Sequence, residues 1–171
     1  DRRAGRRPFL VVASAGTNRP GPTIDTALED FDAVMDLNVR ATFVAAQAFG
    51  RLLLDAARPG RLVLMSSQMG SVGYPGRAVY CASKHAVNGL TKALALEWAR
   101  YGIRVNALAP GYFATELNDD FFEGEHGQAL IKRVPQRRLG QLSELDGPLL
   151  LLISNAGSFM TGSILAVDGG H

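Results

Sequence analysis

Apolar residues in this chain fall into short continuous runs, which alternate with longer stretches where apolar positions recur at helical spacing. Four short runs predict strands, at residues 9–13, 61–66, 103–109 and 164–167. Continuous apolar runs of this length are typical of parallel strands that are buried on both faces. The pattern therefore predicts a parallel sheet with both of its faces covered.

Two long helices are predicted between these strands. Thr26 followed by Glu29 has the pattern of a capping box, which predicts a helix start there, and apolar residues keep helical spacing to about Leu54. A second helix is expected over residues 77–100, with Gly102 as its stop signal.

The last third of the chain is more varied. Residues 115–136 are polar, aromatic and acidic by turns, which predicts a mobile flap with one or two short helices. Such a segment commonly carries substrate contacts, and a variable surface insertion is the equal alternative. Ser143 is expected to cap a last helix that continues to about Ser154.

Strands that alternate with helices predict an α/β fold, here a Rossmann-like three-layer α/β/α arrangement around a parallel sheet. The 171 residues are enough for a single domain with its own core. Residues 1–8, which are rich in arginine, are expected to form a disordered or atypical tail.

The composition excludes several classes of protein. The hydrophobic fraction of 47% is ordinary for a globular domain, and the net charge of +2 is too small to indicate binding to nucleic acid or a membrane. No apolar run approaches the ~20 residues of a membrane span. Cys81 is the single cysteine, which fits a reducing compartment such as the cytoplasm. His85, His126 and His171 are scattered without metal-ligand spacing, so no metal is expected.

Polar residues gather where three of the predicted strands end. Ser14-Ala15-Gly16 follows the first strand, Ser66-Ser67 closes the second, and Pro110-Gly111 follows the third. Ligands bind outside the carboxyl ends of such strands. Tyr80 and Lys84 lie near the start of the second helix, on the same side of the sheet, so these residues predict one site.

The pair formed by Tyr80 and Lys84 has a chemical meaning. Residues four apart stand on one face of a helix, and an ammonium beside a phenol lowers the phenol pKa from about 10 toward neutral. Such a phenol can exchange a proton near physiological pH, and the Ser67 hydroxyl could hold the reacting oxygen. Taken alone, the pair also fits a chance pattern on an exposed helix, and Asn38 fits a core amide equally well.

In this order and spacing, the motifs resemble those of the classical short-chain dehydrogenase/reductase family, over nearly everything from Leu10 to the C-terminus. Tyr80, Lys84 and Ser67 match the catalytic residues of that family, and Asn38 matches the asparagine that completes its tetrad.

The cofactor segments of the family have counterparts here as well. Pro110-Gly111 with Thr115 resembles the segment that lines the nicotinamide, and Asp168-Gly169-Gly170 resembles the terminal turn. The family's Asn-Asn-Ala-Gly appears as Ala13-Ser14-Ala15-Gly16, so Ser14, Ala15 and Gly16 are implied cofactor contacts.

The resemblance implies a role for each matched residue. Tyr80 would protonate a carbonyl oxygen during reduction and act as the base in the reverse direction. Lys84 would lower the pKa of Tyr80 and hydrogen-bond the nicotinamide ribose, Ser67 would hold the substrate oxygen, and Asn38 would position a water. The cofactor would be NAD or NADP, and the substrate a small alcohol or ketone.

Two departures from the family stand out. No T-G-x-x-x-G-x-G turn, which holds the cofactor pyrophosphate, occurs in the sequence, and a serine replaces the second asparagine at Ser14. The resemblance therefore implies an N-terminally truncated domain that lacks about half of the usual sheet and the residue that selects NAD or NADP.

The alternatives are an oxidoreductase acting on a sugar acid or a 3-oxoacyl substrate, and an inactive fragment that keeps only the fold and oligomer contacts. A cofactor-free lyase is disfavoured because such relatives have arginine in place of Lys84.

Self-association is also expected, because a truncated sheet exposes its first strand as an edge, and an exposed edge invites pairing with another chain. The resemblance implies a homotetramer or dimer through residues 32–54, 77–100 and 164–167.

Overall fold

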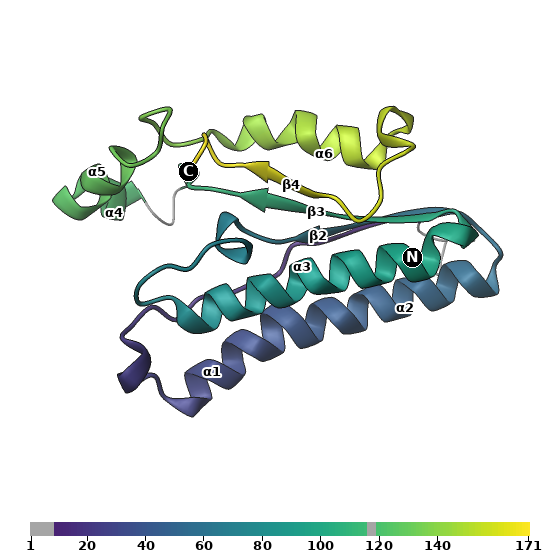
Figure 1. Cartoon of the computed structure of the whole chain (residues 1–171), viewed down its shortest axis with the longest axis horizontal. Coiled ribbons are helices and arrows are strands. Elements are labelled where there is room, and N and C mark those ends of the chain that lie inside the picture. The colour runs from purple at the N-terminus through teal and green to yellow at the C-terminus, as the bar shows by residue number, and fades with distance from the viewer. Residues whose placement is uncertain (1–8, 116–118) are drawn as a thin grey trace.

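The computed structural model describes residues 9–115 and 119–171. Its centre is a four-stranded parallel sheet in the order β1-β2-β3-β4 (Figure 1). The strands are β1 (Leu10–Ala13), β2 (Gly60–Met65), β3 (Ile103–Pro110) and β4 (Ile164–Val167). All four predicted strands are therefore confirmed, with ends that differ by at most one residue.

Helices cover both faces of the sheet, as predicted (Figure 1). One face carries α1 (Leu28–Met35), α2 (Ala41–Asp55) and α3 (Ala78–Trp98), and α1 runs into α2 through the π-helical segment Asp36–Arg40. The other face carries α6 (Asp146–Ile153). Two short helices, α4 (Asp119–Glu123) and α5 (Glu125–Ile131), lie beyond the ends of β3 and β4.

Alternating residues of β2 feed two separate cores, since successive side chains of a strand point to opposite faces. Leu62 and Leu64 pack into the larger core against α2 and α3, whereas Val63 packs with Leu152 on the α6 side. At the crossing of α2 and α3, a Cβ on Gly50 would lie 2.7 Å from the Trp98 ring. The glycine therefore allows the close packing of these two helices.

The first strand is not buried on both faces, which corrects the prediction. Val12 is 36% exposed and Phe9 is 53% exposed. Within the described part of the chain, β1 lies at the edge of the sheet and pairs with β2 alone. An edge position explains why an apolar run typical of a central strand is half exposed here.

Two predicted helix caps are wrong. The helix α1 begins at Leu28 after Ala27, which has no side-chain cap, and the Thr26 hydroxyl donates a hydrogen bond to the Pro22 carbonyl instead. The short turn before α6 is capped by Gln141 together with Glu144, not by Ser143.

Other boundaries agree with the sequence. Gly102 ends the second helix in a left-handed conformation with φ of 72°, as predicted. The two short helices expected within residues 115–136 are α4 and α5. Residues 1–8, and residues 116–118 of the predicted flap, lie outside the described residues. No helix in the described ranges is both long enough and apolar enough to span a bilayer.

Candidate active site

A cavity of about 330 Å³ lies at the carboxyl ends of the strands, where the sequence predicts a site. The ends of three strands and the first turns of α3 bring its walls together. The lining residues are Ser14, Gly16, Thr17, Asn18, Met65, Ser66, Ser67, Tyr80, Lys84, Pro110 and Gly111.

Most of the predicted site residues line this cavity. Three do not, namely Ala15, Asn38 and Thr115. Ala15 is exposed on the loop after β1, and Thr115 is half-buried beyond the end of β3. Asn38 is buried behind the cavity wall. The cofactor contacts predicted at Ala15 and Thr115 therefore stay predictions.

Tyr80 stands in the first turn of α3 with its phenol beside Ser67. Burial raises the pKa of Tyr80 above its ordinary value of 10.0, while the hydrogen bond with Ser67 and the charge of Arg77 act in the opposite direction. The expectation that the lysine holds this pKa near neutral is wrong for this structure, because burial outweighs the lowering effects.

Lys84 lies one turn further along α3 and is buried, with 4% of its surface exposed. Its Nζ donates a hydrogen bond to the Met65 carbonyl over 2.8 Å and lies 5.6 Å from the centroid of the Tyr80 ring. Burial lowers the pKa of Lys84 to about 8. The lysine is thus within reach of the phenol but hydrogen-bonded to the end of β2.

Asn38 positions the wall of the cavity from within the π-helical segment. Its Oδ1 accepts a hydrogen bond from the Thr17 backbone N–H over 2.7 Å. Its Nδ2 donates to the Thr17 carbonyl and to Ser83 Oγ, both over 2.9 Å. The side chain therefore ties the loop after β1 to α3. The water that the family resemblance implies beside Asn38 stays a prediction.

Gly16 lies against this support. A Cβ at Gly16 would be 3.2 Å from Asn38 Oδ1 and 3.5 Å from Lys84 Nζ. The absence of a side chain at Gly16 lets the loop after β1 lie close to Lys84. A larger side chain at this position would narrow the cavity.

Sequence reasoning missed the support beneath Ser67. Ser66 Oγ donates a hydrogen bond to Asn88 Oδ1 over 2.6 Å, and Asn88 Nδ2 donates to the Gly70 carbonyl over 2.8 Å. Both side chains are buried. The signal in the sequence was the spacing of Asn88, which lies two turns after Tyr80 on the helix and so close to the same face.

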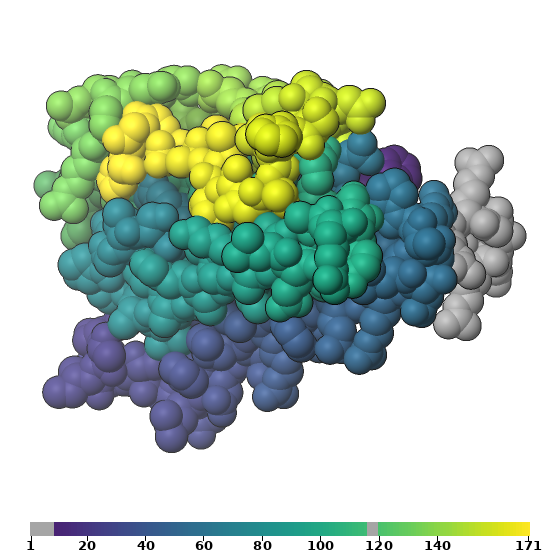
Figure 2. Space-filling view, turned by 45° about the vertical axis from the view of Figure 1, so that its right-hand side comes forward, coloured from purple at the N-terminus to yellow at the C-terminus, as the bar shows by residue number. Residues whose placement is uncertain are grey.

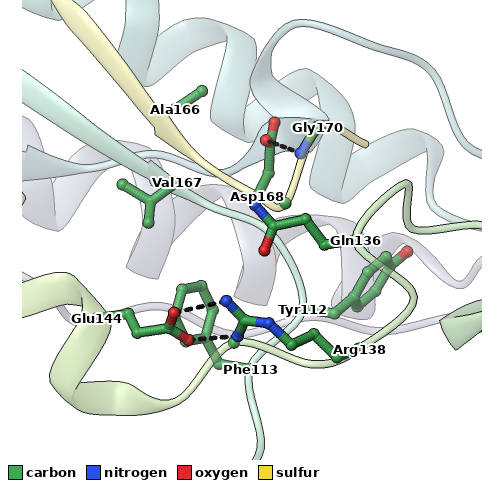
Figure 3. Close-up of a pocket in the computed structure, with 11 residues that line it drawn as sticks. Tyr112, Phe113, Gln136, Arg138, Glu144, Ala166, Val167, Asp168 and Gly170 are labelled. Carbon is green, nitrogen blue, oxygen red and sulfur yellow. Dashed lines mark hydrogen bonds and ion pairs between the residues drawn. The ribbon is translucent and has the colours of Figure 1, made fainter.

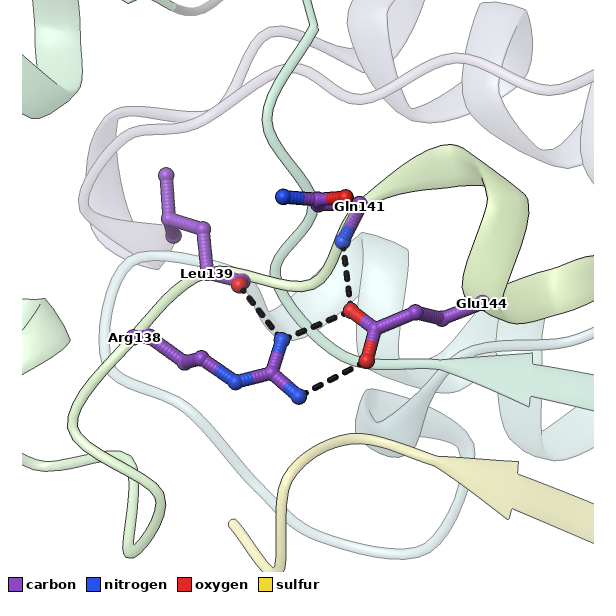
Figure 4. A network of polar contacts seen from close by, with 4 residues as sticks. All are labelled: Arg138, Leu139, Gln141 and Glu144. Carbon is purple, nitrogen blue, oxygen red and sulfur yellow. Dashed lines mark hydrogen bonds and ion pairs between the residues drawn. The ribbon is translucent and has the colours of Figure 1, made fainter.

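A second cavity of about 280 Å³ lies at the carboxyl end of β4 (Figure 3). Two of its charged residues bind each other, and the third, Asp168, accepts a hydrogen bond from the Gly170 N–H. Arg138 forms two hydrogen bonds with the Glu144 carboxylate, of 2.6 and 2.7 Å, and the Gln141 backbone N–H adds a third (Figure 4). These hydrogen bonds lower the pKa of Glu144 to about 2. The network braces the turn before α6, so it is best explained as a structural feature.

The fold and the site together define an α/β protein with helices on both faces of a parallel sheet and with a tyrosine, a lysine and a serine at the carboxyl ends of its strands. A family model described as "Enoyl-(Acyl carrier protein) reductase" matches residues 3–171. The chain belongs to the short-chain dehydrogenase/reductase family, as its motifs predicted.

Named relatives include sugar-acid and polyol dehydrogenases. Gluconate 5-dehydrogenase of Gluconobacter oxydans is 40% identical over 94% of this chain and 63% of its own length. D-threitol dehydrogenase of Mycolicibacterium smegmatis is 36% identical over 95% of this chain and 62% of its own length. The chain therefore spans less than two thirds of the length of these relatives.

A solved structure has the same fold. The gluconate 5-dehydrogenase of Burkholderia cenocepacia, in complex with NADP and tartrate, aligns with a TM-score of 0.92 and 38% identity. The alignment covers 99% of this chain and 66% of that one.

The cavity residues fit one part of a nicotinamide cofactor. Gly16 and Gly111 leave room beside the Ser67 and Tyr80 hydroxyls and the Lys84 ammonium. Hydroxyl and ammonium groups around a small cavity suit a ribose and the ring that it carries. The 171 residues contain no glycine-rich turn of the type that holds a pyrophosphate, so the fit concerns the nicotinamide end.

Proposed function

We propose that the protein interconverts a secondary alcohol and a ketone, with NAD or NADP as the hydride carrier and Tyr80 as the general acid and base. The observation that carries this proposal is the convergence of Ser67, Tyr80 and Lys84 on one cavity with Pro110 and Gly111. A buried phenol beside a hydroxyl and an ammonium is a group that can exchange a proton with a bound substrate.

The residues divide the work of alcohol oxidation. Ser67 holds the substrate oxygen, and Tyr80 in its ionised, phenolate form accepts the hydroxyl proton as the carbon–oxygen double bond forms. Bound NAD or NADP supplies the acceptor for the hydride that leaves the same carbon. Lys84 hydrogen-bonds the nicotinamide ribose. The Ser67 hydrogen bond and the Arg77 charge offset part of the burial that raises the pKa of Tyr80, and Asn38 keeps the Thr17 loop and Ser83 in place.

The names of the relatives support a small, polyhydroxylated substrate. Gluconate and D-threitol carry several hydroxyl groups, and tartrate occupies the solved neighbour. The description of the family model names a reductase that acts on an acyl carrier protein, and a 3-oxoacyl substrate is the alternative to a sugar acid.

We further propose that the protein self-associates, as a dimer or tetramer. Large apolar side chains are exposed along α1, the π-helical segment and α2, namely Phe31, Leu37, Phe43 and Val44. A groove lined largely by Met35, Val39, Phe43 and Leu90 lies among them. Beside β4, the last strand in the order of the sheet, the C-terminal residues form a second part of the surface (yellow in Figure 2). Light scattering that finds a monodisperse monomer would contradict this proposal.

Cofactor titration with a panel of alcohols tests the main proposal. The purified protein should bind NAD or NADP and reduce it in the presence of a sugar acid or polyol. The competing possibility, a chain that keeps the fold but no activity, predicts no nicotinamide binding. We expect a cytoplasmic location, which agrees with the free and buried Cys81, and cell fractionation checks it.

A further inference from the structure

Three polar residues line the reaction cavity without a part in the proton transfer described above, namely Ser14, Thr17 and Asn18. All three belong to the segment that follows β1, so they bound the cavity on the side of that strand. Ser14 is exposed, and the side-chain oxygen of Asn18 is buried. Thr17 is half-buried, and its contacts decide whether its hydroxyl can serve a ligand.

The backbone of Thr17 is fixed from behind by Asn38. The Thr17 N–H donates to Asn38 Oδ1 over 2.7 Å, and Asn38 Nδ2 donates to the Thr17 carbonyl over 2.9 Å. Asn38 is itself 1% exposed and is hydrogen-bonded to Ser83 of α3. Neither backbone contact uses the Thr17 side chain, so the residue should keep its place when that side chain is changed.

The Thr17 hydroxyl has one partner in the described part of the chain. Its Oγ1 accepts a hydrogen bond from Arg19 Nη1 over 3.3 Å, and Arg19 is held in turn by an ion pair with Asp30 of α1. A threonine hydroxyl can donate one hydrogen bond and accept two. Among residues 9–115 and 119–171 it donates to no other group, so its hydrogen is available to an oxygen in the cavity.

The same cavity contains the hydroxyls of Ser67 and Tyr80, which hold the reacting oxygen in the proposed reaction. Its volume is about 330 Å³, so a small substrate bound at Tyr80 shares this space with Thr17. A fixed and half-buried hydroxyl favours a ligand that pairs with it, because a polar group left unpaired on binding is costly. The Thr17 side chain is therefore placed to recognise a second oxygen of the substrate.

We propose that the Thr17 hydroxyl binds a second hydroxyl of the substrate, so that Thr17 determines specificity and the site prefers a diol or polyol to a simple secondary alcohol. This inference rests on the proposed function, because it places the substrate beside Tyr80. A substrate with one hydroxyl leaves the Thr17 hydrogen unpaired, whereas a second hydroxyl pairs with it.

Binding of butane-2,3-diol and butan-2-ol, which share a carbon skeleton and differ by one hydroxyl, tests this inference. Titrations with single stereoisomers are followed by NMR in the presence of NADH or NADPH, neither of which can accept a hydride from an alcohol. The wild-type protein should bind the diol about three- to tenfold more tightly, the effect of one neutral hydrogen bond. Thr17→Val, which keeps the shape of the side chain, should lose this preference, and Thr17→Ser should keep it.

A matched control and a second titration make the test specific. Thr23→Val, at an exposed position in the turn before α1, should bind both alcohols as the wild type does. Titration with NADH and NADPH alone should give the same affinity for Thr17→Val as for the wild type. A cofactor affinity that falls in Thr17→Val would assign the hydroxyl to the cofactor and overturn the inference.

Steady-state kinetics on the same proteins separates the two proposals. If the enzyme oxidises both alcohols, Thr17→Val should raise KM for the diol about three- to tenfold and leave KM for butan-2-ol unchanged. Equal binding of both alcohols by the wild-type protein, no detectable binding of the diol, or a preference that survives in Thr17→Val would overturn the inference. A failure to oxidise any alcohol would overturn the proposed function instead, while the binding comparison would still decide the role of Thr17.

Discussion

Lys84 Nζ donates a hydrogen bond to the Met65 carbonyl over 2.8 Å, so the ammonium is fastened to the last residue of β2. This contact links α3, which carries Tyr80, to the strand that ends beside Ser67. It places a buried cation at the point where the sheet and the helix meet, and this burial lowers the pKa of the lysine.

The stability of the protein should depend on the protonation of Lys84. Its pKa is about 8 in the folded protein and 10.5 when it is unperturbed. Between these values the unfolded chain holds a proton that the folded chain has released, so folding stability should rise with pH in this window. Below about pH 8 both states are protonated and the effect is absent.

Denaturant unfolding of the wild-type protein and of Lys84→Met, at several pH values from 7 to 10.5, measures this effect. The stability difference between the two proteins should change in favour of the wild type as the pH rises through this range. A difference that stays constant would show that the lysine titrates normally.

Asn38 should be needed for stability as well as for the site. Asn38→Ala removes three hydrogen bonds and leaves the Thr17 backbone N–H without its acceptor. We expect a loss of about 1–3 kcal/mol in the free energy of unfolding, the usual cost of a buried group left unpaired. Leu37→Ala, at the neighbouring exposed position, should cost less. Equal losses would argue against a special role for the asparagine.

Ala57 should be replaceable by glycine with a gain in stability. It has φ of 47° and follows the end of α2, where its N–H donates to the Leu54 carbonyl and the next N–H donates to Leu53. This is a Schellman motif, which normally has glycine at this position. Ala57→Gly should raise the free energy of unfolding by about 0.5–1 kcal/mol.

A helical position provides the control for this change. Ala48→Gly, on the exposed surface of α2, should lower stability by about 1 kcal/mol, because glycine is a poor helix former. The expected result is opposite signs for the two substitutions in thermal or chemical unfolding. A loss of stability in both variants would mean that the backbone at Ala57 is not strained.

Glu144 should contribute to stability only while it is ionised. Its hydrogen bonds to Arg138, and to the Gln141 N–H, hold its pKa at about 2, below the ordinary value of 4.5. The contribution is therefore present above about pH 4.5 and is lost as the pH falls toward 2. The pair is solvent-exposed, so the effect should be small and should weaken in high salt.

Acid unfolding of Glu144→Gln and the wild type measures the prediction, with Glu97→Gln on the exposed side of α3 as the control. The stability difference for Glu144→Gln should shrink below pH 4.5, whereas the control should differ little from the wild type. A difference for Glu144→Gln that does not change with pH would contradict the assignment.

Much of the fold could be predicted from the sequence, because strand and helix periodicities are local properties. The four strands, the long helices and the stop at Gly102 all follow from residue spacing. The caps could not be predicted in this way, since Thr26 has a competing partner in Pro22 and Gln141 replaces Ser143. The half-exposed β1 depends on its neighbours in the sheet, which a local pattern does not contain.

The site could be predicted where its residues belong to a sequence motif. Properties that depend on burial, such as the pKa of a side chain, could not be predicted. Ser67, Tyr80 and Lys84 could be found from their spacing. The direction of the Tyr80 pKa could not, because it depends on how much burial opposes the neighbouring groups. Asn88 belongs to no motif, and its hydrogen bonds to Ser66 and to the Gly70 carbonyl become visible only in the structure.

The most direct measurement of the central claim is hydride transfer to NAD or NADP by the wild-type protein and by Tyr80→Phe, followed through the nicotinamide absorbance with gluconate and D-threitol. The wild type should reduce the cofactor, and Tyr80→Phe should lose at least about 100-fold in kcat while keeping its fold, since a general acid and base contributes 10²- to 10⁴-fold. Equal rates for the two proteins would contradict the role of Tyr80, and no transfer by the wild type would contradict the proposed function itself.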